Sequence, residues 1–393
     1  MTVFSNKPEI NLREKLTELD TKASVAGRAF LRAENTIEQA QLLGLQPQRN
    51  MFINGDQQVW QYGTSFTNIG ATQEDMISDR WRHYAVTGGR STWSRSTDAP
   101  YGFEYSLKIE CTTASSSPSA THRLNVAYRM TSEDARILYG GGERPSGESQ
   151  ARGFTIQFWV KTNRPGVYCL DSYFNVTAPT CKKTYTIEKA NVWQHVVLTF
   201  PHHPNGASNP SFWWWLMAGS NYTTNDRGEN WTTSTDGRAY GQTTNILDTV
   251  GNTFYIAGIQ MVPGEYPDGV PFAHRQYSEE LQLCQRYYYL RRGHVGQRHV
   301  IGYATSTSQF NGVIDLPVTM RTTPALITSG TTTDYTLVHA TGGVVNIGSL
   351  PTYGGTEDGG YILCTGASGL TAGSGAQLRS ANSSGFLAFD AEM

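Results

Sequence analysis

Charge is scarce in this 393-residue sequence. Asp, Glu, Lys and Arg make up 16% of it, where about a quarter is usual. The 31 basic and 33 acidic residues nearly cancel, to a net charge of −2. No overall field draws such a chain onto nucleic acid or an anionic membrane, and we expect neither partner. No apolar run approaches the 18 residues of a membrane-spanning helix, and MTVFSNKPEINLREK lacks the features of a signal peptide.

Cysteine patterns and catalytic motifs are also missing. The five cysteines are an odd number without CxxC spacing, which favours free thiols made in a reducing cytosol. No GxSxG, HExxH, P-loop or GxGxxG motif occurs in a strand–helix context. His202 and His203 would point to opposite faces of a strand, so a surface loop is favoured over a metal site. We expect no metal, no cofactor and no catalytic residue.

Residues typical of strands and turns are abundant. The sequence has 40 glycines, 45 threonines and 45 aromatic residues. So many aromatic side chains bury too much apolar area for a disordered chain. A helical bundle would need more Ala, Leu, Glu and Lys. The composition therefore predicts a mostly β protein, long enough for two or three folded units.

Residues 1–49 carry a different pattern. Apolar or small residues recur at alternating spacings of four and three, which keep one seam facing a partner helix. Asn11 would begin the helix and Gly44 would end it. A single amphipathic helix lying on its own domain is the alternative. We favour a coiled-coil-like segment for oligomerisation, with the seam Leu12, Leu16, Leu19, Ala23, Ala26, Phe30, Ala33, Ile37 and Ala40.

From residue 50 to 277 the apolar pattern alternates every second residue. One short helical stretch interrupts it near Ser132–Tyr139. Many strands without crossover helices predict an antiparallel jelly-roll β-sandwich. The clearest half-buried strands are predicted at 154–160, 183–187, 193–200 and 252–259.

A connector helix is predicted within residues 278–299. Ser278 would cap it, Glu279 and Glu280 would lie in its first turn, and Arg291 and Arg292 in its last. Residues 300–393 are rich in Thr, Gly and Ser and predict a small C-terminal β-sandwich, with disorder as the weaker alternative. Its strands are expected at 313–318, 325–327, 361–364 and 386–391.

Aromatic and acidic clusters are the candidates for chemistry. On a strand, Trp213 and Trp215 would share one face and Trp214 the other, so core packing is favoured over a ligand platform. Loops project from the end of a sandwich, and the polar loop 220–240 is better placed for a ligand. Its receptor-binding candidates are Tyr222, Trp231 and Tyr240. Its carboxylates, Asp226, Glu229 and Asp236, could cleave glycosides only as a correctly spaced pair.

Three motifs stand at the start of the β-rich part of the chain. They are Asn50-Met51-Phe52-Ile53-Asn54-Gly55-Asp56-Gln57-Gln58-Val59, Gly63-Thr64-Ser65 and Ser78-Asp79-Arg80-Trp81. Together they resemble motifs of tail-fibre-like virion proteins of tailed bacteriophages. The chain departs from the family at Gln260–Gly264, where an acidic position is lost. The resemblance covers about 340 residues and implies a carbohydrate-module-like sandwich, a terminal fibre β-module and no catalytic residues. It marks no receptor-contacting residue. Further similar stretches are 105–114, 154–161, 213–221, 254–260 and 277–289.

The resulting hypothesis is a non-enzymatic virion protein, a tail fibre that recognises a host-surface glycan. Its expected partners are itself, as a homotrimer, other proteins of the tail or capsid, and a host polysaccharide or receptor. Residues 1–49 would dock the chain on the virion, so the terminal module would lie farthest from the particle and recognise the host. A capsid-decorating or head fibre, or a fibre adaptor, is the alternative in the same class. A glycan-degrading tail enzyme and a free secreted lectin belong to different classes.

Overall fold

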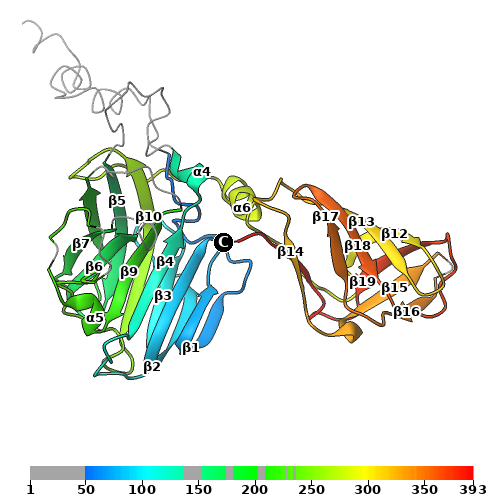
Figure 1. Cartoon of the computed structure of the whole chain (residues 1–393), viewed down its shortest axis with the longest axis horizontal. Coiled ribbons are helices and arrows are strands. Elements are labelled where there is room, and N and C mark those ends of the chain that lie inside the picture. The colour runs from blue at the N-terminus through cyan, green and yellow to red at the C-terminus, as the bar shows by residue number, and fades with distance from the viewer. Residues whose placement is uncertain are drawn as a thin grey trace, which may run out of the picture. The chain divides into compact units, whose positions relative to one another are not determined.

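The computed structural model describes residues 49–136, 153–173, 180–201, 209–226, 228–232, 236–340 and 342–392. The predicted N-terminal helix, with its seam from Leu12 to Ala40, lies outside these residues, as do His202 and His203. From Asn50 onward the chain forms one compact unit. This unit is mostly β, as predicted (Figure 1).

Ten strands form the first sheet within the described ranges, in the order β7-β6-β9-β4-β2-β3-β10-β5-β8 with β1 beside β2. All the pairings are antiparallel. The strands are β1 (Ser65–Met76), β2 (Trp81–Ser96), β3 (Ser106–Thr113), β4 (Arg123–Arg129), β5 (Phe154–Thr162), β6 (Gly166–Tyr173), β7 (Thr180–Ile187), β8 (Gln194–Phe200), β9 (Ser211–Ala218) and β10 (Thr253–Pro263).

The long strand β2 joins two layers. Its first half, Trp81–Val86, pairs with β4, and its second half, Arg90–Ser96, pairs with β3. β1 pairs with the opposite edge of β2. The two layers pack face to face, because Phe158 of β5 lies 5.8 Å from Trp214 of β9 between ring centroids. The described chain therefore forms a jelly-roll-like sandwich, and the four predicted strands correspond to β5, β7, β8 and β10.

Among the described residues, three short helices accompany the sandwich: α4 (Ser132–Ala135), α5 (Ser220–Thr223) and α6 (Tyr277–Gln285). The first is the interruption predicted near Ser132. The connector prediction was partly wrong, because α6 ends at Gln285 and its N-cap is Gln276. The expected last turn is instead strand β11 (Tyr288–Arg291), which pairs with Leu387–Asp390. Aromatic side chains there favour a strand once a partner strand is present.

The last hundred residues form two further sheets that share one buried core. A three-stranded sheet has the order β11-β20-β14, and a seven-stranded sheet has the order β16-β15-β19-β12-β13-β18-β17. Phe389 of β20 packs edge-on against Tyr353 of β17, with 5.3 Å between centroids. The elements are β12 (Arg298–Ala304), β13 (Phe310–Asp315), β14 (Ala325–Thr328), the 3-10 helix η2 (Thr332–Asp334), β15 (Tyr335–His339), β16 (Val344–Asn346), β17 (Thr352–Gly355), β18 (Gly359–Cys364), β19 (Gly375–Ser380) and β20 (Leu387–Asp390).

Candidate functional site

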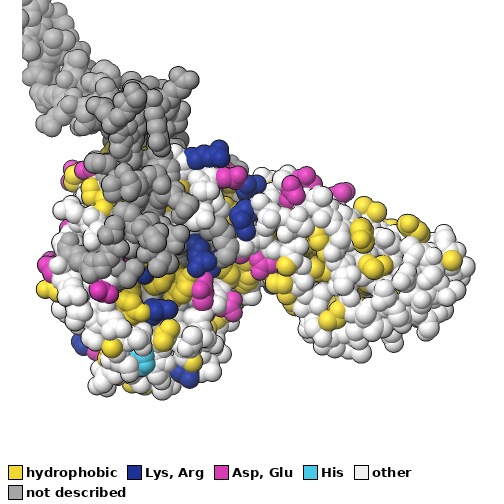
Figure 2. All heavy atoms as spheres, in the orientation of Figure 1, with side chains coloured by type: hydrophobic (Ala, Val, Ile, Leu, Met, Phe, Trp, Pro, Cys, Tyr) yellow, Lys and Arg dark blue, Asp and Glu magenta, His cyan; other side chains and the backbone are white. Residues whose placement is uncertain are grey.

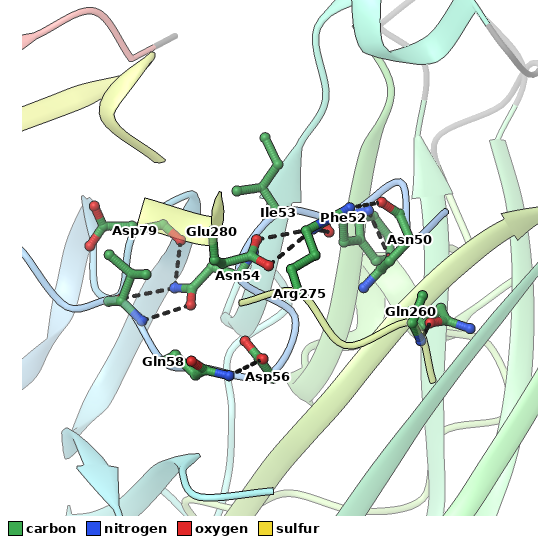
Figure 3. Close-up of polar contacts among 12 residues, drawn as sticks. Asn50, Phe52, Ile53, Asn54, Asp56, Gln58, Asp79, Gln260, Arg275 and Glu280 are labelled. Atoms are coloured by element: carbon green, nitrogen blue, oxygen red, sulfur yellow. Dashed lines mark hydrogen bonds and ion pairs between the residues drawn. The ribbon is translucent and has the colours of Figure 1, made fainter. Parts of the chain in front are cut away.

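The motif residues that carry the resemblance form a buried polar hub (Figure 3). Asn54 Nδ2 donates to the carbonyls of Val59 (2.8 Å) and Asp79 (3.1 Å), and Asn54 Oδ1 accepts from Val59 N (2.9 Å). Glu280 Oε1 of α6 accepts from Asn54 N and lies 3.0 Å from Arg275 Nη1. These contacts hold the opening segment against α6. The motif therefore marks a structural junction.

Arg80 performs a similar structural role beside this hub. Its side chain is fully buried, with its guanidinium carbon 3.5 Å from the ring centroid of Tyr287. It forms an ion pair with Glu392 and donates from Nη2 to the carbonyl of Arg129 (2.7 Å). Burial raises the pKa of the neighbouring Asp79 to about 7. These residues face the protein interior and offer no surface to a ligand.

A polar cleft lies over the outer face of the sandwich. Its volume is about 450 Å³, within the range of ~300–1,000 Å³ typical of ligand pockets. Its walls come from β4, the end of β6, α5 and the loop that follows α5. The lining residues are Arg123, Tyr173, Asn221, Tyr222, Thr224, Asn225, Asp236 and Arg238.

Arg238 is fixed in this cleft by a carboxylate and two aromatic rings. Its Nε donates to Asp171 Oδ2 at 2.6 Å, and its guanidinium carbon lies 4.1 Å from the Trp213 centroid and 4.2 Å from the Tyr173 centroid. Asp171 is completely buried, and this burial raises the pKa of its carboxyl to about 6 although Arg238 opposes the rise. The arrangement fixes the guanidinium at the wall of the cleft.

The strands behind the cleft carry buried polar atoms without partners. Asn125 of β4 lies between Trp215 and Tyr84 of the adjoining strands. It is completely buried, and neither its Nδ2 nor its Oδ1 has a hydrogen-bond partner among the described residues. The same holds for Nε1 of Trp213 and of Trp215. Buried polar atoms are normally hydrogen-bonded, so the amide of Asn125 and the indole N–H groups of Trp213 and Trp215 are exceptions to this rule.

The three receptor-binding candidates have different surroundings. Tyr222 lines the cleft, where its hydroxyl accepts from Arg123 Nη1 (2.5 Å) and its ring lies 4.9 Å from that of Trp215. Tyr240 is half-buried, with Lys182 Nζ 5.4 Å from its ring centroid. Trp231 packs on the sandwich core and donates from Nε1 to the carbonyl of Pro201 (2.9 Å). Only Tyr222 of the three lines the cleft.

The three acidic candidates have different neighbours. Asp226 Oδ1 lies 3.7 Å from Lys182 Nζ, and Glu229 Oε2 lies 3.0 Å from Lys183 Nζ. Partial burial opposes ionisation of Glu229, but Lys183 holds the pKa of this carboxyl below its ordinary value. A general acid in glycoside cleavage needs a raised pKa. Asp236 lines the cleft.

The tryptophan cluster has the alternation expected of a strand. Trp214 faces the sandwich core, while Trp213 and Trp215 lie on the outer face with Ala239 and Tyr222 packed against them. All three are buried, which agrees with the favoured core interpretation. Arg238, Asp171 and Asn125 were not among the site residues predicted from the sequence. The alternation of apolar and polar residues in β6 and β4 would have placed Asp171 and Asn125 on the outer face. No pattern in the nearby sequence indicated which residues would contact them.

Other kinds of site have little support in the part of the chain that is described. No group of three or more His, Cys, Asp or Glu side chains there could hold a metal ion. No described helix is long and apolar enough to cross a membrane. All five cysteines are unpaired and buried, and burial raises the pKa of each thiol, which lowers its reactivity.

No protein-family model and no curated protein matches the sequence. Among solved structures, the enzymatically active domain of tailspike protein 4 from bacteriophage CBA120 aligns with 55% of this chain and 21% of its own, at 13% identity and a TM-score of 0.28. A family 11 carbohydrate-binding module of a Clostridium thermocellum cellulase aligns over 50% of this chain and 99% of the module, at 11% identity and a TM-score of 0.27. TmCBM61, solved with β-1,4-galactotriose, aligns over 55% of this chain and 99% of its own, at 8% identity and a TM-score of 0.26. The chain spans about a fifth of the length of that tailspike domain.

Proposed function

We propose that this protein binds a glycan in the polar cleft of its sandwich. The observation that carries the proposal is the combination of ring faces and mixed hydrogen-bonding groups around one cavity. Sugars present many hydroxyl groups, each both donor and acceptor, beside apolar C–H faces. Amide, hydroxyl, carboxylate and guanidinium groups match the hydroxyls. Tyr173 and Tyr222 supply the aromatic rings.

The biological role we propose is host recognition by a non-enzymatic protein of a tailed-bacteriophage virion, as a tail fibre. The motifs at Asn50–Val59 and Ser78–Trp81 support this role through their resemblance to tail-fibre-like proteins. Single sugar contacts are weak, and a homotrimer would present three clefts. Joint presentation of this kind can raise apparent affinity by about 10²–10⁴-fold. A head fibre or a fibre adaptor is the alternative placement, which immunogold labelling of virions would distinguish from the tail.

The test of binding against cleavage uses the purified full chain and surface polysaccharide from the host. We expect the polysaccharide to retain the protein on an affinity gel, with no release of reducing sugar ends during prolonged incubation. Release of reducing ends that is lost in Asp236→Asn or Glu229→Gln would show a glycan-degrading enzyme instead. Failure of every host polysaccharide to retain the protein would reject glycan binding.

A further inference from the structure

Basic residues are rare in the C-terminal part of the chain, yet two of them face each other. Residues 294–393 contain three basic side chains, Arg298, Arg321 and Arg379, and six acidic ones. Arg321 donates to the carbonyls of Ala391 and Glu392. Arg298 of β12 and Arg379 of β19 are directly opposite partners in the seven-stranded sheet.

The opposed arginines lie on the outer face of this sheet. Arg379 alternates with the buried Leu378 and Ser380, and Arg298 is exposed. Like charges directly opposite each other on a sheet destabilise it. Neither guanidinium has an ion pair with an acidic side chain of the described chain, and Arg379 Nε has no hydrogen-bond partner there. The sheet thus concentrates positive charge at one place although acidic residues outnumber basic ones in this region.

A hollow of about 350 Å³ adjoins Arg298. Arg291, which β11 contributes, also lines it and has no acidic partner among the described residues. Burial, with a contribution from Arg291, lowers the pKa of His299 to about 4, so this imidazole is neutral near pH 7. Asp315 is the acidic side chain in the lining. Two arginines, Arg291 and Arg298, therefore line the hollow with one carboxylate, and Arg379 lies opposite Arg298 on the adjoining strand.

Apolar side chains continue from the arginines across the same face. Ile301 and Val313 are directly opposite partners, 65% and 66% exposed, and both line the hollow. The next partner along this row is the exposed Tyr361 of β18. On the face seen in Figure 2, uncharged side chains cover most of this β-domain, with scattered apolar groups. A positive end beside an apolar row suits a ligand with an anionic group on a ring.

We propose that this hollow is a binding site for an acidic saccharide, whose phosphate or carboxylate group binds Arg298 and Arg291, with Arg379 opposite Arg298, and whose ring rests on Ile301 and Val313. Guanidinium groups bind such oxyanions with paired, charge-assisted hydrogen bonds. The bound anion would also relieve the repulsion between the opposed arginines. This site is separate from the cleft of the sandwich, and neither proposal depends on the other.

The first experiment measures binding to the full chain by isothermal titration calorimetry in a buffer of low anion content. The probes are inorganic phosphate, glucose 6-phosphate, glucuronate and glucose, with sodium chloride at matched ionic strength as the control. We expect the phosphates, glucuronate or both to bind, and glucose and chloride to give no signal. Binding of phosphates alone identifies a phosphorylated saccharide, and binding of glucuronate alone identifies a uronate.

The second experiment compares Arg298→Gln and Arg379→Gln with Arg95→Gln, a control in the sandwich where Arg95 stacks on Tyr105. Each hollow variant should lose anion binding at least tenfold and, without anion, should unfold at a higher temperature than the wild type because the repulsion is gone. The control should bind anions normally. Absence of any anion binding beyond chloride, or unchanged binding in both hollow variants, would overturn the proposal.

Discussion

Arg238 and Asp171 show how one residue pair shapes the candidate site. Both side chains of this ion pair are buried, yet Arg238 is part of the wall of a polar cleft. A buried charge is tolerated when its partner and its hydrogen bonds are in place, and removal of one partner leaves the other charge uncompensated. The pair therefore links the stability of the sandwich to the geometry of the cleft.

Removal of this arginine should strongly destabilise the sandwich. We expect Arg238→Ala to lower the free energy of unfolding by about 3–5 kcal/mol, because Asp171 is then buried without its partner. The double variant Asp171→Asn/Arg238→Gln should recover most of the loss, since neither side chain is charged. Urea unfolding of the three proteins at pH 7 measures both effects. A double variant as unstable as Arg238→Ala would show that packing on Trp213 and Tyr173 dominates.

His83 should make stability depend on pH. It lies buried beside Trp93, and burial lowers its pKa from 6.5 to about 4. A pKa lowered in the folded state gives stability that is present above pH 6.5 and is lost as pH falls through 4. Protonation of His83 therefore lowers the free energy of unfolding by about 3 kcal/mol between pH 7 and pH 4.

The contribution of His83 can be measured by comparing how the free energy of unfolding changes with pH in the wild type and in His83→Phe. The variant should lose less stability on acidification, and His294→Gln, at an exposed position, should behave as the wild type. An identical pH dependence in wild type and His83→Phe would contradict the expected pKa.

At the scale of elements, the loop after α5 determines the shape of the cleft. Asn225 and Gly237 have positive φ angles of 67° and 68°. A side chain at Gly237 would place its Cβ 2.2 Å from the carbonyl oxygen of Asn225. Gly228 has nearly the same φ, 66°, but no atom lies within 4 Å of its Cβ position. Substitutions at the two glycines share the backbone strain of a positive φ, but only a substitution at Gly237 brings a steric clash. Comparing them therefore separates the two effects.

Gly237→Ala should therefore weaken glycan binding more than Gly228→Ala does. Both variants bear the strain of a non-glycine residue at positive φ, about 1 kcal/mol. Only Gly237→Ala must also move the Asn225 backbone at the rim of the cleft. Titration of the host polysaccharide against each variant gives the comparison. Equal affinities in the two variants would show that this rim does not contact the ligand.

The sequence predicted elements well where the pattern is local. Alternation in β5, β7, β8 and β10 reflects one face buried in the sandwich, and that pattern is visible in the residues themselves. The end of α6 was not predictable in this way, because Tyr288–Arg291 becomes a strand only through pairing with residues about a hundred positions later. The part of the cleft beyond the predicted loop 220–240 was missed for the same reason. Arg238 meets Asp171 through the loop, across 67 residues.

At the scale of the whole molecule, the predicted trimer depends on a segment outside the described residues. The seam from Leu12 to Ala40 predicts self-association, and multi-angle light scattering should give about three times the 43.4 kDa of one chain. Leu16→Asp combined with Phe30→Asp should weaken assembly while the circular dichroism of the β-domains is unchanged. A mass near that of one chain for the intact protein would contradict the trimer.

The central claim is that the sandwich cleft binds a host glycan. The most direct measurement is the affinity of the host surface polysaccharide for the wild type and for Asn221→Ala/Asn225→Gly, in which glycine preserves the positive φ of residue 225. Loss of two hydrogen-bonding side chains at about 0.5–1.5 kcal/mol each predicts affinity weakened about 5- to 150-fold, with an unchanged melting temperature. Tyr101→Ala, at a fully exposed aromatic outside the cleft, should bind as the wild type does. Wild-type affinity in the folded cleft variant would contradict the account.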